Sequence, residues 1–253
     1  MTLEVVSHGA FEVTVVPCLR DNYAYVVRST RSGFVAVVDP SEDAPIVAAL
    51  ATLPGGARLD AIWATHHHHD HVGGIEVLVA TFGAKVVGHA SESARIPRMD
   101  VPVEHGDAVP AGDLDVSVLH VPGHTRGAVT FVVRGGDAPA AFTGDTLFLA
   151  GCGRMFEGDP ETMFASMRTL AALPGDSAIY CGHEYTVANL AFATQVEPSN
   201  ADVGTATTRA AARRAEGRPT VPGTVAEELR VNPFLRAADA ATFGARRRAK
   251  DAF

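Results

Sequence analysis

The sequence predicts an α/β domain followed by a helical segment, and three observations lead to this fold class. Short runs of β-branched and aromatic residues, typical of strands, fill the first half of the chain. Several apolar strands end directly in polar residues, as they do at the ligand-binding edge of an α/β sheet. After Glu184 almost no stretch has a strand pattern, and helical spacing takes over.

The N-terminal half is expected to form strands with one intervening helix. Residues 11–15 alternate between apolar and polar side chains, which is the two-residue period of a half-buried strand. A turn at Asp39-Pro40-Ser41 is suited to start a helix. The elements expected here are strands over residues 23–27, 34–38 and 61–64 and a helix over residues 44–53.

The rest of the chain changes from strands to helices. Met163, Met167 and Leu170 show helical spacing, and prolines separate the helical stretches that follow. We place the domains at residues 1–175 and 176–253. Strands are expected over residues 85–87, 114–120, 129–133, 140–142 and 178–180, and helices over residues 160–173, 186–195, 202–216 and 225–229.

Composition excludes several classes of protein. The net charge of −8 over 253 residues argues against nucleic-acid binding, which needs a cationic face. No run approaches the roughly 18 apolar residues of a membrane helix. The three cysteines are widely spaced, and the N-terminus lacks the basic and apolar regions of a signal peptide. We therefore expect a cytoplasmic protein without disulfides or membrane contact.

A histidine-rich run follows the apolar strand at residues 61–64. The run, residues 65–71, reads THHHHDH and holds five of the eleven histidines. Because alternate residues of an extended chain share a face, His66, His68 and Asp70 should point together. His71 joins them if the chain turns into a helix there. His67 and His69 have the opposite parity, so we expect them to lie behind the ligands or face solvent.

Further ligands should come from other strand ends, since one segment cannot surround two ions. His124, Asp145 and His183 each end an apolar strand, and a glycine precedes each of them. Imidazole and carboxylate ligands suit zinc, iron or manganese and do not choose among them. The predicted ligands are His66, His68 and His124 for one ion, Asp70, His71 and His183 for a second, and Asp145 as a bridge between both.

Each of these residues also has a simpler interpretation. A single histidine at a strand end is usually a hydrogen-bonded polar residue, and a lone Gly-Asp is usually a turn. The remaining histidines lack such a context and are expected to be structural. A non-enzymatic metal buffer or scaffold would also fit the cluster alone, because it needs no substrate residues.

At this point the sequence resembles the metallo-β-lactamase superfamily, whose members carry H-x-H-x-D-H followed by His, Asp and His. It resembles the glyoxalase II, or hydroxyacylglutathione hydrolase, family more closely, and the resemblance runs from about residue 12 to the last residue. The motifs that carry it are DNYAY at residues 21–25, GDTLF at 144–148, GCGRMFEG at 151–158, CGHEYT at 181–186, NPFLR at 232–236 and RRAKD at 247–251.

The resemblance implies an αββα sandwich with two divalent metal ions, followed by a small all-helical domain that helps to bind glutathione. It implies that Arg154, Tyr185, Arg247 and Lys250 contact the glutathione part of the substrate. Phe156 stands at this site where the family often has a tyrosine. The segment at residues 237–245 also looks shorter than is usual. A protein with net negative charge needs such a local cationic patch to bind the two carboxylates of glutathione.

The implied reaction is hydrolysis of S-(2-hydroxyacyl)glutathione, chiefly S-D-lactoylglutathione, to D-lactate and glutathione, a step of methylglyoxal detoxification. A metal-bridging hydroxide would attack the thioester, Asp70 would position it, and the thiolate would leave without a general acid. We expect the protein to act as a monomer. The alternatives are a persulfide dioxygenase, which needs one metal shell, and another hydrolase of this fold, such as a β-lactamase or nuclease.

Overall fold

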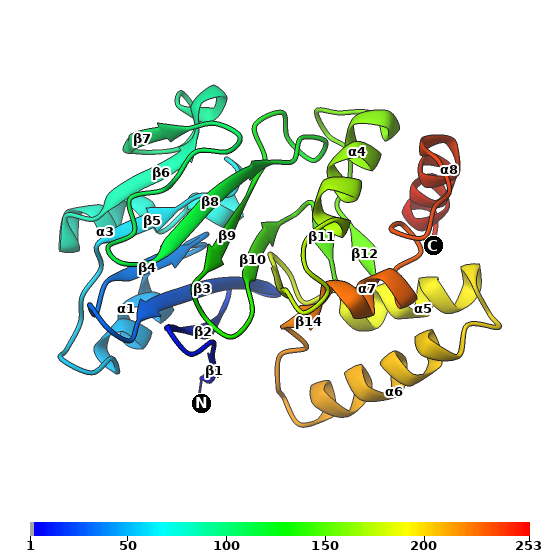
Figure 1. Cartoon of the computed structure of the whole chain (residues 1–253), viewed down its shortest axis with the longest axis horizontal. Helices are drawn as coiled ribbons and strands as arrows, with labels where there is room; N and C mark the ends of the chain where they lie inside the picture. Colours follow the sequence, from blue (N-terminus) through cyan, green and yellow to red (C-terminus); the bar gives the residue numbers. More distant parts are fainter. Residues whose placement is uncertain (1–2) are drawn as a thin grey trace.

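The computed structural model describes residues 3–253 and consists of two β-sheets packed face to face, with helices outside them and a group of helices at the C-terminal end (Figure 1). In the first sheet the strands follow chain order. Neighbours from β1 to β4 pair antiparallel, and neighbours from β4 to β7 pair parallel. Its strands are β1 (Glu4–Ser7), β2 (Phe11–Cys18), β3 (Asn22–Ser29), β4 (Val35–Val38), β5 (Ala61–Trp63), β6 (Lys85–His89) and β7 (Met99–Val103).

The second sheet has the order β14-β13-β10-β9-β8, and only β10 and β13 are parallel within it. Its strands are β8 (Asp115–His120), β9 (Val129–Arg134), β10 (Ala140–Gly144), β13 (Ala178–Cys181) and β14 (Gly223–Thr224); β11 (Leu147–Phe148) and β12 (Gly151–Cys152) form a separate hairpin. The two-residue strand β14 is a correction to the expected all-helical C-terminal domain. It forms because this segment returns to the sheet edge beside β13.

Helices cover the outer faces of the sandwich and make up most of the C-terminal part. The short helices α2 (His69–Val72) and η1 (Ala90–Glu92) belong to loops at one edge of the first sheet. The others are α1 (Asp43–Ala51), α3 (Ile75–Phe82), α4 (Pro160–Ala171), α5 (Thr186–Val196), α6 (Ala201–Ala215), α7 (Val225–Val231) and α8 (Ala240–Asp251). The helices expected from spacing are present, and α8 contains the basic tail of the expected helical domain.

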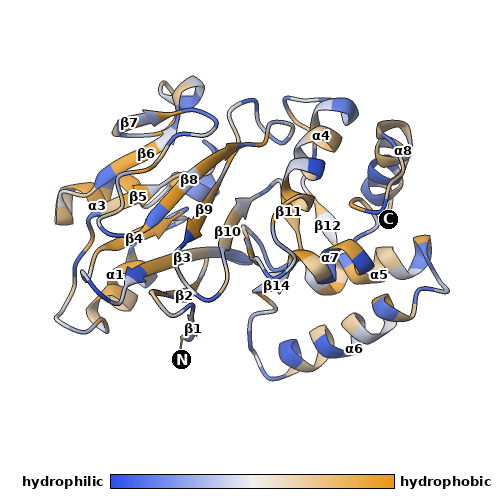
Figure 2. Cartoon of the chain, viewed as in Figure 1, coloured by the Kyte–Doolittle hydropathy of each residue, from blue (hydrophilic) through white to orange (hydrophobic). Residues whose placement is uncertain are grey.

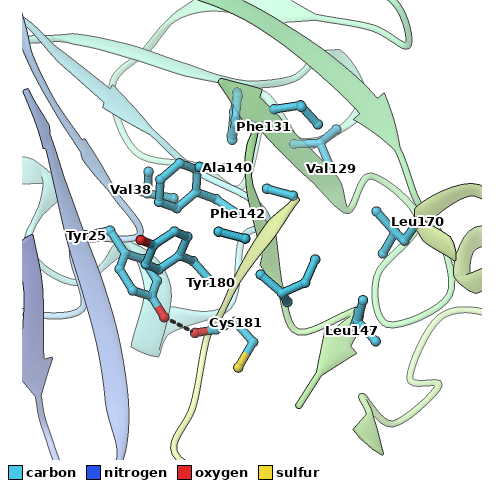
Figure 3. Close-up of a cluster of buried hydrophobic side chains, with 14 of the residues drawn as sticks. Tyr25, Val38, Val129, Phe131, Ala140, Phe142, Leu147, Leu170, Tyr180 and Cys181 are labelled. Carbon is cyan, nitrogen blue, oxygen red and sulfur yellow. Dashed lines mark hydrogen bonds between the residues drawn. The ribbon is translucent and has the colours of Figure 1, made fainter. Parts of the chain in front are cut away.

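Alternating side chains divide the apolar residues between two layers of core. Phe11, Val13 and Val15 of β2 pack into the core between the sheets, whereas Val16 and Cys18 pack on the outer side against α1 and α3. On the other side, Leu170 of α4 and Leu147 lie across β10 from the inter-sheet core (Figure 3). The order helix, sheet, sheet, helix confirms the predicted αββα sandwich.

Aromatic residues tie the two sheets together close to one end of β13. Tyr25 of β3 packs against Phe142 and Tyr180, and its hydroxyl donates a hydrogen bond to the carbonyl of Cys181 (Figure 3). The Tyr23 amide donates to the Gly182 carbonyl at 2.8 Å. These contacts fix the position at which the chain leaves the sheet toward His183.

The C-terminal helices form their own small core and are joined to the sandwich by buried polar contacts. Figure 2 shows the strands in hydrophobic colours and hydrophilic residues along α6 and α8. At the junction, the carboxylate of Glu184 accepts hydrogen bonds from the Tyr23 hydroxyl at 2.6 Å and from the backbone and side chain of Thr220, both at 2.8 Å. The small core consists of Ala150, Leu190, Ala193, Val203, Ala206, Ala210 and Val231. Within residues 3–253, no helix is both long and apolar enough to cross a membrane.

Glu228 of α7 joins the helical part to the β11–β12 hairpin. Its buried carboxylate accepts hydrogen bonds from the Ala150 amide at 2.8 Å and the Asn232 side chain at 2.9 Å. The Asn232 amide also donates to the Gly151 carbonyl at 3.0 Å. Burial raises the pKa of Glu228 to about 8. The connection therefore contains an acid that resists ionisation in the folded protein.

We expect Glu228→Gln to stabilise the protein more at pH 9 than at pH 5. The folded pKa lies above the ordinary value of 4.5, so the wild type loses stability as the pH rises from 4.5 to about 8. The amide keeps a hydrogen-bond acceptor and does not ionise, so it should gain about 1–3 kcal/mol at pH 9. Urea unfolding at both pH values measures this. Glu216→Gln, which changes a glutamate whose side chain is 63% exposed, is the matched control. Equal gains at the two pH values would contradict the prediction.

Candidate active site

The candidate ligands meet because their strands end at one edge of the sandwich. The THHHHDH segment follows β5, His124 follows β8, Asp145 follows β10 and His183 follows β13. Polar groups at such strand ends line the crevice where α/β proteins bind ligands. The helix α2 starts at His69, and this turn brings His71 to the side of His66, with their ring centroids 4.2 Å apart.

Three histidines form the first donor group. The Nδ1 atom of His68 lies 3.1 Å from His66 Nε2 and 2.9 Å from His124 Nε2. Ligand atoms of all three residues lie within 4.8 Å of one another. His66 and His124 are buried, and His68 is half-buried and lines a cavity. This is the set that the sequence assigned to one metal ion.

Asp70, His71 and His183 form the second donor group. Their ligand atoms likewise lie within 4.8 Å of one another. The Asp70 Oδ2 atom is 3.7 Å from His71 Nε2 and 3.4 Å from His183 Nε2. Asp70 has the most exposed side chain of the three, at 42%, and it faces the same cavity as His68.

Asp145 lies between the two donor groups. Its Oδ2 atom is 3.5 Å from His124 Nε2 in the first group and 3.3 Å from His183 Nε2 in the second. Its Oδ1 atom is 3.4 Å from His71 Nε2. A carboxylate in this position is within reach of ions in both groups, which is the geometry that a bridging ligand requires.

Hydrogen bonds from outside the cluster orient the rings. Asp39 Oδ2 lies 3.0 Å from His71 Nδ1, and Asp21 Oδ1 lies 2.8 Å from His183 Nδ1. His124 Nδ1 faces the Arg154 carbonyl at 2.9 Å. Histidines that bind metals usually donate their second N–H to such partners, which fixes the tautomer and the ring orientation. In each case the Nε2 atom is left pointing into the cluster.

The support that Asp39 and Asp21 give to the ligand rings was not predicted from the sequence. Asp39 also accepts hydrogen bonds from the amide and hydroxyl of Thr65, at 2.7 and 2.6 Å, so both of its carboxylate oxygens have hydrogen-bond partners. It has a positive φ of 48°, which is uncommon outside glycine. Its place at the end of a parallel strand next to β5 was the one available signal.

Burial and charge set the protonation of the cluster. Burial lowers the pKa of His66 and His124, and with the neighbouring His124 ring it lowers the pKa of His68 to about 4. Burial opposes ionisation of His183 as well, but hydrogen bonds to Asp145 and Asp70 raise its pKa to about 10. The first group therefore presents neutral imidazoles, which is the form that binds metals.

The donor chemistry fits divalent metal ions. The buried His71 Nε2 and Asp145 Oδ1 atoms have no hydrogen-bond partner among the described residues. The Nε2 atoms of His66 and His124 both face the one Nδ1 atom of His68, which can donate its single proton to only one of them. A cation between these atoms would satisfy both features. The cluster is thus a site for divalent metal ions.

The other histidines lie outside the donor groups. His67 points away from the cluster toward Glu92, and His69 is exposed, in keeping with their opposite parity. His8 pairs with Tyr180 at 2.8 Å, and the rings of His89 and His120 stack on each other.

A cavity of about 440 Å³ opens beside the cluster. Phe156 closes one side, with its ring centroid 5.6 Å from that of His68. Tyr185 stacks on His183 with a centroid distance of 4.7 Å. All five residues predicted to contact substrate are among those lining the cavity: Arg154, Phe156, Tyr185, Arg247 and Lys250.

The basic residues of the cavity differ in how free they are. Arg247 is buried, and its two Nη atoms donate to the Cys152 carbonyl at 2.8 Å and to Asp251 at 2.9 Å. Lys250 donates to the Ala188 carbonyl at 3.0 Å. The Arg154 side chain is 68% exposed and lies 3.7 Å from the same Asp251 carboxylate. Arg154 is the least constrained cation of this end of the cavity.

Two family models match the chain on either side of residue 183. Residues 19–183 match the metallo-beta-lactamase superfamily, and residues 184–253 match the hydroxyacylglutathione hydrolase C-terminus. The chain is 46% identical to a hydroxyacylglutathione hydrolase of Acidiphilium cryptum over 98% of this chain and 99% of that protein.

Solved structures share the fold. ETHE1 from Myxococcus xanthus aligns with a TM-score of 0.67 and 24% identity, covering 98% of this chain and 90% of its own. TTHA1623 in a di-iron-bound form aligns with a TM-score of 0.59 and 26% identity, covering 87% of this chain and 98% of its own. The likeness to ETHE1 concerns the fold alone.

We expect Gly182→Ala to weaken metal binding by about 10- to 100-fold, the usual cost of disturbing the support of a ligand. A Cβ atom at Gly182 would lie 2.3 Å from Asp145 Oδ1 and 2.7 Å from His71 Cε1, so both side chains must move. Zinc titration against a chromogenic chelator measures the change. Gly204→Ala, where a Cβ meets nothing within 4 Å, should bind zinc like the wild type. Unchanged affinity in Gly182→Ala would show that these side chains do not hold the metal.

Proposed function

The chain belongs to the hydroxyacylglutathione hydrolase family of the metallo-β-lactamase superfamily, and we propose that its principal substrate is S-D-lactoylglutathione, hydrolysed to D-lactate and glutathione. Thioester hydrolysis with divalent metal ions follows from the family and the cluster. The acyl group is our proposal, as are the metal identity, for which zinc is the first candidate and iron or manganese the others, and a monomeric state.

One observation supports this substrate class most strongly: donor groups for metal and basic residues line the same cavity. Glutathione has two carboxylates remote from its sulfur. The protein has a net charge of −8, so a carboxylate ligand needs a local cationic surface. Arg154, Arg247 and Lys250 supply it, and arginine side chains match the geometry of a carboxylate.

We assign His66, His68 and His124 to one ion and Asp70, His71 and His183 to a second, with Asp145 as the shared ligand. Such ions supply an activated water and a Lewis acid for the thioester carbonyl. The assignment places both functions at the end of the cavity where His68, Asp70 and Asp145 are accessible. The reacting carbonyl would then lie there, with the glutathione part directed toward Arg154.

Asp70 is placed to orient the attacking water. Its Oδ2 atom accepts a hydrogen bond from the Asn22 side chain at 3.0 Å, and Asn22 also donates to the Asp70 carbonyl at 3.0 Å. This double contact holds the carboxylate toward the cavity. A water that donates a hydrogen bond to Asp70 would direct its lone pair toward the thioester carbon.

The leaving group needs no acid from the protein. A thiol has a pKa of about 8.5, so a thiolate departs readily near neutral pH. Cys152 and Cys181 lie near the site, but burial raises the pKa of each to about 12. Neither cysteine would form the thiolate that a covalent mechanism requires. This supports direct attack by water over an acyl-enzyme route.

The second donor group favours hydrolysis over oxygenation. A persulfide dioxygenase uses a single iron and needs only one donor group. Here both groups are complete, and Asp145 contacts residues of each. Two adjacent ions suit the polarisation of a carbonyl together with the activation of water.

The direct test of the substrate is the loss of thioester absorbance when metal-replete protein is mixed with S-D-lactoylglutathione. We expect turnover by the wild type and a loss of more than about 100-fold in Asp145→Ala, because a direct ligand should matter more than an outer partner. Asp202→Ala removes a carboxylate of α6 that is 55% exposed and should retain full activity. Absence of turnover by the wild type would reject this substrate.

We expect Lys250→Ala to raise KM about 10-fold with a smaller change in kcat. Lys250 lines the cavity but belongs to neither donor group, so its charge would contribute to binding in the ground and transition states alike. Steady-state kinetics with S-D-lactoylglutathione separates the two parameters. Lys85→Ala, which removes a lysine that is 68% exposed on β6, serves as control. An unchanged KM would exclude Lys250 from the substrate site.

A further inference from the structure

A network of charged residues lies behind the first donor group, on the side away from the cavity. We call it the His67 network, and it consists of His67, Glu92, Arg95 and Glu157. His67 lies between His66 and His68 in the chain, and Glu157 directly follows Phe156, which packs on His68 and His124. The mechanism described above uses none of the four residues.

Glu92 is the buried centre of this network, with 0% of its surface exposed. It ends η1, the short helix after β6. Its Oε1 atom accepts a hydrogen bond from the Gly127 amide at 3.0 Å, and its Oε2 atom contacts His67 Nδ1. Arg95 Nη2 also lies 3.4 Å from Glu92 Oε1. A carboxylate this deeply buried is costly unless it is paired, and His67 and Arg95 together provide that pairing.

The loop after His124 packs directly on Glu92. A Cβ atom at Gly127 would lie 2.4 Å from Glu92 Cγ, so this position has no room for a side chain. The Gly127 amide is also the donor to Glu92. Glu92 therefore links the segment that holds His66 and His68 to the segment that holds His124.

Polar contacts surround the ring of His67. Its Nδ1 atom faces the Glu92 carboxylate, and its Nε2 atom lies 3.1 Å from Arg95 Nη1, which can only donate. The ring is thus held from both sides. Because His67 is covalently joined to His66 and His68, fixing this ring fixes the direction in which its two neighbours point.

Glu157 extends the same support to the other wall of the site. It accepts hydrogen bonds from Arg95 Nη1 at 2.6 Å and from the Arg126 amide at 2.8 Å. Its segment also contains the Arg154 carbonyl, which orients His124. The network thus connects the segments that carry His66, His68 and His124 with the segment whose carbonyl orients His124.

We infer that Glu92 and His67 are positioning residues that hold His66, His68 and His124 in their metal-binding arrangement. The inference rests on the proposed function only in assigning those three histidines to a metal ion. Asp70, His71 and His183 are supported by Asn22, Asp39 and Asp21, none of which belongs to the His67 network. Loss of the network should therefore weaken one metal site and leave the other intact.

The experiment titrates metal-free protein with zinc against a chromogenic chelator, in the absence of substrate. The wild type should bind two zinc ions tightly. Glu92→Gln and His67→Ala should each lower the affinity of one zinc site by about 10- to 100-fold and leave the second site at wild-type affinity. The double variant should be no worse than either single variant, because both changes break one contact. His69→Ala alters an exposed histidine of the same run and should bind like the wild type.

Glu157→Gln keeps the experiment decisive if a change at the buried Glu92 prevents folding, because the Glu157 side chain is 24% exposed. It should lower the zinc affinity of the same site. In turnover assays, all network variants should lower kcat more than they raise KM, with partial rescue of kcat by excess zinc. Equal weakening of both ions, wild-type affinities for both, or strictly additive effects would each overturn the inference. Failure of the wild type to hydrolyse the glutathione thioester would reject the substrate while leaving this zinc result intact.

Discussion

The structure depends on one unfavourable arrangement: imidazole lone pairs and carboxylate charges converge within a few ångströms at a buried edge of a β-sandwich. His66 and His124 both face the single Nδ1 atom of His68, which can donate to only one of them, and the buried Asp145 Oδ1 atom has no hydrogen-bond partner among the described residues. Such a cluster is costly without bound cations, and the surrounding structure must prevent the side chains from turning away. Much of the architecture around the site serves this second requirement.

Two layers of structure keep the cluster in place. The sandwich sets the strand ends, and the Tyr25 contact with the Cys181 carbonyl determines where the chain leaves β13. Outside the donor atoms, Asp39, Asp21 and the Arg154 carbonyl then orient individual rings. The His67 network adds a third kind of support by joining the loop of His66 and His68 to the loop after His124.

The sequence predicted the donor groups better than their supports. The two-residue period of an extended chain predicted His66, His68 and Asp70. A glycine just before a polar residue, after an apolar strand, predicted His124, Asp145 and His183. The αββα order was also predictable, because apolar periodicity is local. Asp39, Asp21 and Glu92 were not predicted, since their roles depend on which strands become neighbours. The strands β1 and β7 were also missed, because their residues are mixed in character and gain order from packing.

The junction at His183 and Glu184 has a consequence for how this protein can be recombined. His183 belongs to the second donor group, Glu184 connects Tyr23 to Thr220, and Tyr185 lines the cavity. Three successive residues thus serve the metal cluster, the attachment of the helices and the substrate cavity. In a chimaera that exchanged the segment after His183 for that of a relative, Thr220 would be replaced together with Glu184. The contact with Tyr23 of β3 would persist only if the new segment kept the same partners for Tyr23. The two family segments are separable as sequence patterns, but in the folded protein both depend on the contacts of residues 183–185.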